Sequence, residues 1–295
     1  GRLFFTAYDD IHGRGLWKSD GTPAGTQLVK EIGGSESNFI IVNGTLFFTT
    51  DGQDGQQLWK SDGTTGGTKR IATLDGSITD LTPVGKSLLF VHNEALWRSD
   101  GTSAGTKLVT TAAFEPMDLT SIGNVVYFSA VTEERGRELW KSDGTAKGTV
   151  LVKDINTGYV DSNPYGFVNL GGSIYFTAID SRGAELWRTD GTAKGTFIVG
   201  NLKREDGYYN DGSDPSSLTV IGNSMYFTAN DGVHGRKVWI VQGPDAIAPK
   251  ATSIQRTQIG SVDDESVRWK VVFSEPVRGV SLDDFQLVGK GLAGA

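Results

Sequence analysis

Two histidines at matching places in the chain are the first residues whose spacing points to chemistry. His12 and His234 each lie five residues before a tryptophan and three residues after an aspartate. An imidazole beside a carboxylate suits a zinc or manganese site, or a general base in hydrolysis. His92 has the same spacing to its own tryptophan. In the other three copies of this spacing the residue differs: Asp54, Arg135 and Arg182. The alternative, which we favour, is a repeated loop residue that hydrogen-bonds its own turn.

Three carboxylates form the second candidate site. Aligning the chain by its repeated aromatic pairs puts Asp80 and Asp118 at one level, with Glu115 just before Asp118. At the level of Asp80 and Asp118 the other repeats carry Asn38, Gly166 and Ser217, and the level of Glu115 is filled elsewhere by Ser35, Ser77, Asn163 and Asp214. Carboxylates that converge from neighbouring repeats favour a hard cation such as calcium, or a divalent transition metal. The alternative is a set of solvated carboxylates bonded to backbone N–H groups.

An internal repeat defines the elements that must position these residues. The segment Leu-Trp-Lys-Ser-Asp-Gly-Thr at 16–22 returns at 58–64, 96–102, 139–145 and 186–192, each time followed by a second Gly-Thr. A sixth, degraded copy surrounds Trp239. A hydrophobic and aromatic segment precedes each copy, and the tryptophans are 38 to 52 residues apart. Six matched pairs of segments establish a repeat protein.

Each repeat reads as four short strands. In the fourth repeat they are expected at 119–122, 125–130, 138–142 and 149–154, separated by Gly-Asn and Asp-Gly turn signals. Four antiparallel strands at this period are typical of a propeller blade. The sequence therefore predicts an all-β protein, a β-propeller of six four-stranded blades over 1–243. The first repeat begins at its second strand, and the sixth lacks its fourth strand.

The repeated segment, with Glu138 and Glu185 at its head in two copies, resembles the bacterial ELWxxDGT repeat family. The resemblance covers residues 1 to about 243, and five of the six copies match closely. It implies a β-propeller in exported or surface-attached bacterial proteins and implies no particular activity. The chain departs from the motif where other residues replace the glutamate: Gly15, Gln57, Ala95 and Lys237.

The repeated aspartates and tryptophans each allow two interpretations. The five aspartates before Gly-Thr are either a ring of cation sites or caps of the turn between the third and fourth strands. The six tryptophans are either platforms for ligands or fillers of the wedge between neighbouring blades. Because all repeats use these residues identically, we favour the structural role for both.

Composition and the C-terminal segment set further limits. The formal charge of −7 argues against nucleic acid as a partner, no apolar run is long enough to span a membrane, and Cys is absent. The first residues are already strand-like, so we expect a piece of a longer chain. Residues 244–295 change character after a Pro-rich linker and resemble the first half of a bacterial Ig-like surface domain, a partial β segment.

These observations favour a monomeric binding or structural propeller of a secreted or cell-surface bacterial protein. Its channel-mouth loops would contact a glycan, a protein or a cation. The run 203–211, rich in Tyr and acidic residues, is either a sugar-binding rim or, as we favour, an ordinary long surface loop. The alternative is a metal-dependent hydrolase of the lactonase or phosphotriesterase kind. In that case Asp80, Asp118 and Glu115 would hold the metal, and His12 or His234 would be the general base.

Overall fold

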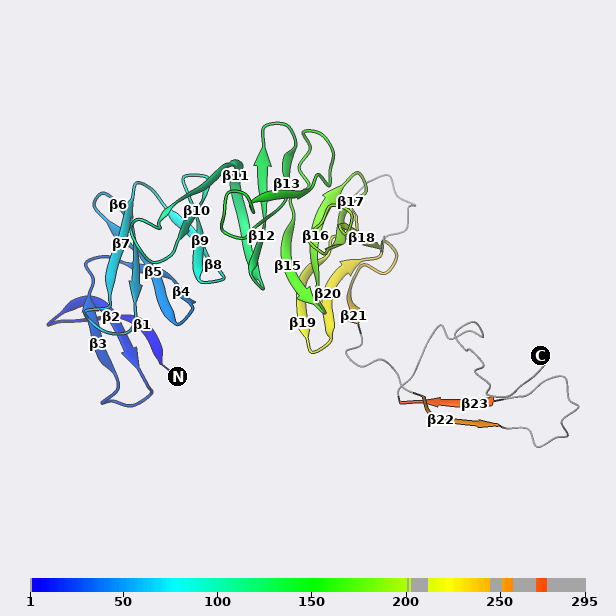
Figure 1. Cartoon of the computed structure of the whole chain (residues 1–295), viewed down its shortest axis with the longest axis horizontal. Helices are drawn as coiled ribbons and strands as arrows, with labels where there is room; N and C mark the ends of the chain where they lie inside the picture. Colours follow the sequence, from blue (N-terminus) through cyan, green and yellow to red (C-terminus); the bar gives the residue numbers. More distant parts are fainter. Residues whose placement is uncertain (1, 201, 203–211, 245–250, 257–268, 275–295) are drawn as a thin grey trace, which may run out of the picture. The chain divides into compact units, whose positions relative to one another are not determined.

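The computed structural model describes residues 2–200, 202, 212–244, 251–256 and 269–274 (Figure 1). Every regular element in these residues is a β-strand. The chain divides into two compact units, Gly1–Gly243 and Pro244–Ala295. Within the described part, no helix has the length and apolarity needed to cross a membrane. The protein is therefore all-β, as the repeat pattern predicted.

The first unit consists of consecutive antiparallel sheets. The first sheet contains β1 (Leu3–Asp9), β2 (Gly13–Ser19) and β3 (Gln27–Glu31). The second contains β4 (Glu36–Val42), β5 (Thr45–Gly52), β6 (Gly55–Ser61) and β7 (Lys69–Leu74). The fourth sheet contains β15 (Tyr165–Leu170), β16 (Ser173–Asp180), β17 (Gly183–Thr189) and β18 (Phe197–Gly200). The fifth contains β19 (Ser216–Ile221), β20 (Ser224–Asn230) and β21 (Arg236–Gln242). Among the described residues, the first and last sheets have three strands each, as expected for a first repeat that begins at its second strand and a sixth repeat without its fourth.

The third and fourth repeats depart from the expected separate blades. Their strands join in one seven-stranded sheet, in which neighbours along the chain are also neighbours in the sheet. Its strands are β8 (Ile78–Val84), β9 (Ser87–His92), β10 (Ala95–Ser99), β11 (Lys107–Ile122), β12 (Val125–Thr132), β13 (Gly136–Ser142) and β14 (Val150–Lys153). Strand β11 is both the last strand of the third repeat and the first strand of the fourth (Figure 1). The connections between the other repeats contain glycine, whereas 107–122 has none, so the chain stays extended.

The core explains the repeated aromatic residues. The second aromatic of each pair is fully buried at Phe48, Phe90, Phe128 and Phe176. From the second repeat onward, each tryptophan of the repeat packs toward the preceding repeat. Trp59 lies against the cluster that includes Leu16 of the first repeat. Trp140 packs in a cluster with residues of the third repeat. The tryptophans thus fill the space between neighbouring repeats, as favoured from the sequence.

The aspartate of each repeat caps its turn. In the second repeat, the Asp62 carboxylate accepts the Thr64 backbone N–H at 2.9 Å and the Thr64 hydroxyl at 2.7 Å. These donors hold the pKa of Asp62 below its ordinary value. The same hydrogen bonds form at the other four aspartates, Asp20, Asp100, Asp143 and Asp190. The turn-capping interpretation is confirmed, and it leaves these carboxylates engaged within their own turns.

Neighbouring repeats are joined in a repeated way. Their first strands contact one another in order, β4 with β8, β8 with β11, β11 with β15 and β15 with β19. The Lys18 ammonium donates to the Gly63 carbonyl of the next turn at 2.9 Å. Lys141 donates likewise to the Gly191 carbonyl at 2.8 Å. In the described part of the chain, no strand of the first sheet pairs with a strand of the last.

The second unit contains one antiparallel pair, β22 (Ala251–Arg256) with β23 (Trp269–Phe273). Alternating apolar and polar residues predict strands at 267–277 and 283–287 in this segment. β23 falls within the first of these ranges. The second lies outside the described residues.

Candidate functional site

A β-bulge interrupts the first strand in five repeats, at the level that the sequence alignment singled out. The pairing register slips by one residue in β4, β8, β11, β15 and β19. The first bulge residue has a left-handed backbone with φ between 53° and 70° in every case: Asn38, Asp80, Asp118, Gly166 and Ser217. Bulges re-aim side chains, and strained backbone of this kind is concentrated at functional sites. The five positions are therefore structurally equivalent.

Two of the three predicted metal ligands are brought together. Asp80 and Asp118 occupy equivalent bulges on β8 and β11, which contact each other. Partial burial and, secondly, the negative charge of Asp118 raise the pKa of Asp80 above its ordinary value. Glu115 binds a different partner. Its carboxylate lies 2.8 Å from the Arg137 guanidinium, and its backbone carbonyl accepts a hydrogen bond from Arg137 Nη1 at 2.6 Å.

The side chain of Arg137 explains why the predicted three-carboxylate cluster does not form. This guanidinium is 7% exposed, and a buried cation requires an anionic partner. Within the described ranges, no three His, Asp or Glu side chains lie together as metal ligands would. Of the three residues predicted to hold calcium or a transition metal, Asp80 and Asp118 occupy equivalent bulges and Glu115 forms an ion pair with Arg137, and the metal site itself stays a prediction.

The two candidate general bases are each held by an aspartate of their own hairpin. His12 Nδ1 lies 2.9 Å from Asp9 Oδ2, and His234 Nδ1 lies 2.8 Å from Asp231 Oδ2. The Asp9 hydrogen bond raises the pKa of His12, and the donors of the His234 turn lower the pKa of Asp231. Each aspartate also accepts the backbone N–H of its histidine. These contacts are those of a loop residue bonded to its own turn.

His92 does not occupy the equivalent loop, which corrects the expectation from its spacing. It ends β9, pairs with Ala95 across a two-residue turn and is 2% exposed. Its ring meets Trp97 edge-on, with centroids 5.2 Å apart, and Nδ1 lies 3.2 Å from the Ser77 carbonyl. The hairpin of the third repeat has a shorter loop than that of the first repeat. The residue five positions before the tryptophan therefore lies in a strand in the third repeat (His92) and in the loop in the first (His12).

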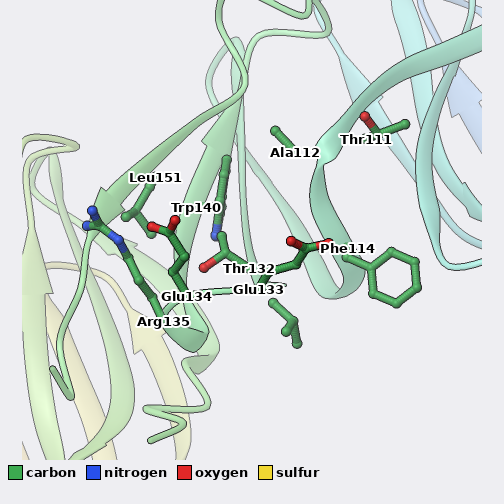
Figure 2. A pocket seen from close by; sticks show the side chains of 10 residues that line it. Thr111, Ala112, Phe114, Thr132, Glu133, Glu134, Arg135, Trp140 and Leu151 are labelled. Atoms are coloured by element: carbon green, nitrogen blue, oxygen red, sulfur yellow. The ribbon is translucent and has the colours of Figure 1, made fainter. Parts of the chain in front are cut away.

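A pocket of about 530 Å³ opens beside Trp140, at the loop between β12 and β13 (Figure 2). The residues that line it are Thr111, Ala112, Phe114, Val131, Thr132, Glu133, Glu134, Arg135, Trp140 and Leu151. Trp140 Nε1 and Thr132 Oγ1 are buried and have no hydrogen-bond partner in the protein. Figure 2 shows both atoms on the inner wall, with the glutamates beside them. Sequence reasoning did not find this pocket. The sugar-binding rim expected at 203–211 lies outside the described residues.

No protein-family model and no curated protein matches the chain. Solved structures that it resembles include a puromycin hydrolase mutant (11% identity, 74% of this chain, 38% of that chain, TM-score 0.45) and TolB from Acinetobacter baumannii (15%, 82%, 64%, 0.39). An uncharacterized protein from Listeria monocytogenes gives 10% identity, 82% of this chain, 79% of that chain and a TM-score of 0.46. The chain spans less than two thirds of the first two. Likeness at this level assigns neither a family nor an activity.

Proposed function

We propose that the chain is a binding module in which the six repeats close into a propeller and one end of their sheets presents loops to a partner. The observation that carries the proposal is the different placement of the residues that repeat and the residues that vary between repeats. The repeated residues are engaged in turn caps and in packing between repeats. The residues that vary between repeats lie in the hairpin loops and the bulges.

The terminal sheets support ring closure. Val238 of the last sheet takes the position at which Leu139 and Leu186 are buried against the next repeat, yet it is 71% exposed. Tyr226 beside it is 38% exposed, whereas its equivalent Tyr127 is 5% exposed. In the preceding repeats, the residues equivalent to Val238 and Tyr226 form one apolar half of the contact between a repeat and the next one. The first sheet of the same chain offers the complementary half, so we assign it as the occupant.

The partner class that we favour is a glycan on or near a bacterial surface, with the chain itself on an exported protein. The end that carries the bulges also carries Glu115, the Arg137 ion pair and the pocket beside Trp140. Aromatic, carboxylate and guanidinium groups together are suited to hydroxyl-rich ligands. A rigid ring of this kind binds by presenting preformed groups, which keeps the entropic cost of association low.

An array of bacterial and host glycans, probed with the whole chain, tests the proposal. We expect saturable binding to a defined subset of glycans. In parallel, lactone and phosphotriester substrates are offered with calcium, zinc or manganese present. Metal-dependent turnover that Asp118→Asn abolishes would overturn the binding-module proposal in favour of a hydrolase. The absence of binding to every glycan and every surface protein offered would also overturn it and leave a spacer role.

A further inference from the structure

The pocket beside Trp140 exists because one small residue replaces a large one. Six residues after the threonine of the second Gly-Thr, four repeats carry a large aliphatic side chain: Ile32, Leu74, Ile155 and Leu202. Each of these packs in the same cluster as the tryptophan of the next repeat. The third repeat carries Ala112 at this position in the sequence, and Ala112 lines the pocket. The register of β11 shifts here, so Ala112 is exposed and its neighbour Ala113 packs in the cluster with Trp140. Both residues are small, so no large aliphatic side chain covers the end of Trp140.

The inner wall of the pocket offers two unused polar groups. Trp140 is 5% exposed, and its indole N–H, like those of Trp17 and Trp187, has no acceptor in the protein. Of these three tryptophans, Trp140 is the one that lines this pocket. The Thr132 hydroxyl is also buried and unpaired. In the second repeat the equivalent indole of Trp59 donates to Thr50 at 3.0 Å and to Gln57 at 3.2 Å. In the fourth repeat, Ala130 and Glu138 replace Thr50 and Gln57, and the Glu138 carboxylate already accepts from Ile155 and Ser162. Because an unpaired buried donor is costly, the inner wall favours a ligand that supplies an acceptor.

The remaining walls narrow the class of ligand. Ala112, Val131 and Leu151 are apolar and suit a methyl group. At the rim, the ring of Phe114 is 46% exposed, and Glu133 and Glu134 are exposed carboxylates that accept hydroxyl protons. The Arg135 guanidinium lies 3.8 Å from Asp154. The two glutamates disfavour acidic sugars. A carbonyl acceptor, a methyl group and a hydroxylated ring occur together in an acetamido sugar.

We propose that this pocket binds the N-acetylhexosamine unit of a glycan. The acetamido carbonyl accepts from Trp140 Nε1–H and the Thr132 hydroxyl. The acetamido methyl group packs against Ala112 and Leu151, and the pyranose ring lies against Phe114, with its hydroxyls toward the two glutamates (Figure 2). The volume of about 530 Å³ lies in the range typical of small-molecule sites, roughly 300–1,000 Å³. This proposal rests on the proposed function and gives it a ligand and a position.

The test follows the indole N–H signals of the ¹⁵N-labelled whole chain during titration with N,N′-diacetylchitobiose. We expect the Trp140 signal, assigned with Trp140→Phe, to shift saturably. The Trp59 signal should stay in place because its N–H is already bonded. Cellobiose has hydroxyls where the probe has acetamido groups, and we expect it to bind at least about tenfold more weakly, through the loss of a hydrogen-bond acceptor and a buried methyl group.

Two variants separate the site from the fold. Ala112→Ile restores the side chain of the other repeats, so binding should fall at least about tenfold while thermal stability is kept or raised. Thr132→Val removes one hydroxyl and should weaken binding about fivefold. A Trp140 signal that neither sugar moves, or equal shifts with both sugars, would overturn the proposal. Glycan binding on the array without a shift at Trp140 would overturn this site alone. Failure of both experiments would overturn the proposed function as well.

Discussion

Replacing Gly67 with alanine is expected to lower the free energy of unfolding by about 2–4 kcal/mol, whereas the same change at Gly66 should alter it by less than about 0.5 kcal/mol. A Cβ atom at Gly67 would coincide with the Asp62 carboxylate. That carboxylate would have to leave the turn and give up both of its bonds to Thr64. Nothing lies within 4 Å of a Cβ at Gly66. Urea unfolding of the two variants measures the difference.

A double variant tests the cause of this loss. In an Asp62→Ala background the carboxylate is gone, so Gly67→Ala should cost much less than it does in the natural chain. The same logic explains why the second glycine recurs in five repeats, each time beside the turn aspartate. Equal losses at Gly66 and Gly67, or strictly additive losses in the double variant, would contradict the turn-capping account.

The second large effect is on the pH dependence of stability, through the buried carboxyl group of Glu138. This side chain is fully buried, and Oε2 accepts the Ile155 N–H at 2.6 Å and the Ser162 hydroxyl at 2.7 Å. Burial raises the pKa of Glu138 from 4.5 to about 7, although these donors act in the opposite direction. Glu185, at the same position in the fifth repeat, also has a raised pKa for the same reason.

The sign of the effect follows from proton linkage. Between pH 4.5 and about 7 the native protein keeps a proton on Glu138 that the unfolded chain has lost. The free energy of unfolding contributed by this group therefore falls as the pH rises through that window, by about 3 kcal/mol in total, and is constant above it. Glu138→Gln, which keeps an acceptor for Ile155 and Ser162, should remove this fall and make the protein more stable than the natural chain at pH 8.

Urea unfolding at pH 5 and pH 8 measures this prediction. The exposed Glu134 gives the matched control, because Glu134→Gln removes the same charge from the surface and should leave the pH dependence unchanged. The Glu138→Gln, Glu185→Gln double variant should flatten the profile further. A Glu138→Gln protein that loses as much stability between pH 5 and pH 8 as the natural chain would contradict the assignment.

The repeat made much of the fold predictable from the sequence. Turn glycines and alternating strands placed β12 and β13 within two residues of the ends observed. The capped turns and the two incomplete terminal sheets followed from the same pattern. The continuous strand β11 did not, because its signal in the sequence is the absence of glycine from one connection. Local sequence patterns predict the strands well. Whether two strands are separated by a turn or form one continuous strand depends on whether the connection contains a residue such as glycine that interrupts it.

The candidate sites were less predictable because they depend on contacts between repeats. Alignment placed Asp80 and Asp118 at equivalent bulges, but the ion pair of Glu115 with Arg137 spans two strands, β11 and β13, that lie on either side of β12 in one sheet. The spacing of His92 matched that of His12, and hairpin length made them different. The pocket beside Trp140 had a signal in the sequence, Ala112 among four large aliphatic residues. That signal has meaning only once the position is known to pack against the next tryptophan.

Closure of the six repeats into one ring is tested most directly by distances between spin labels. The chain has no cysteine, so single cysteines can be placed in hairpin loops at Ile11, Asp54 and Val233, all of which are exposed. Ile11 and Asp54 lie in neighbouring repeats and give the reference distance. If the ring closes, Ile11 and Val233 are also neighbours, and their distance should match the reference with a narrow distribution. An Ile11–Val233 distance clearly longer than the reference, or a broad distribution, would show that the sheets do not form a closed propeller.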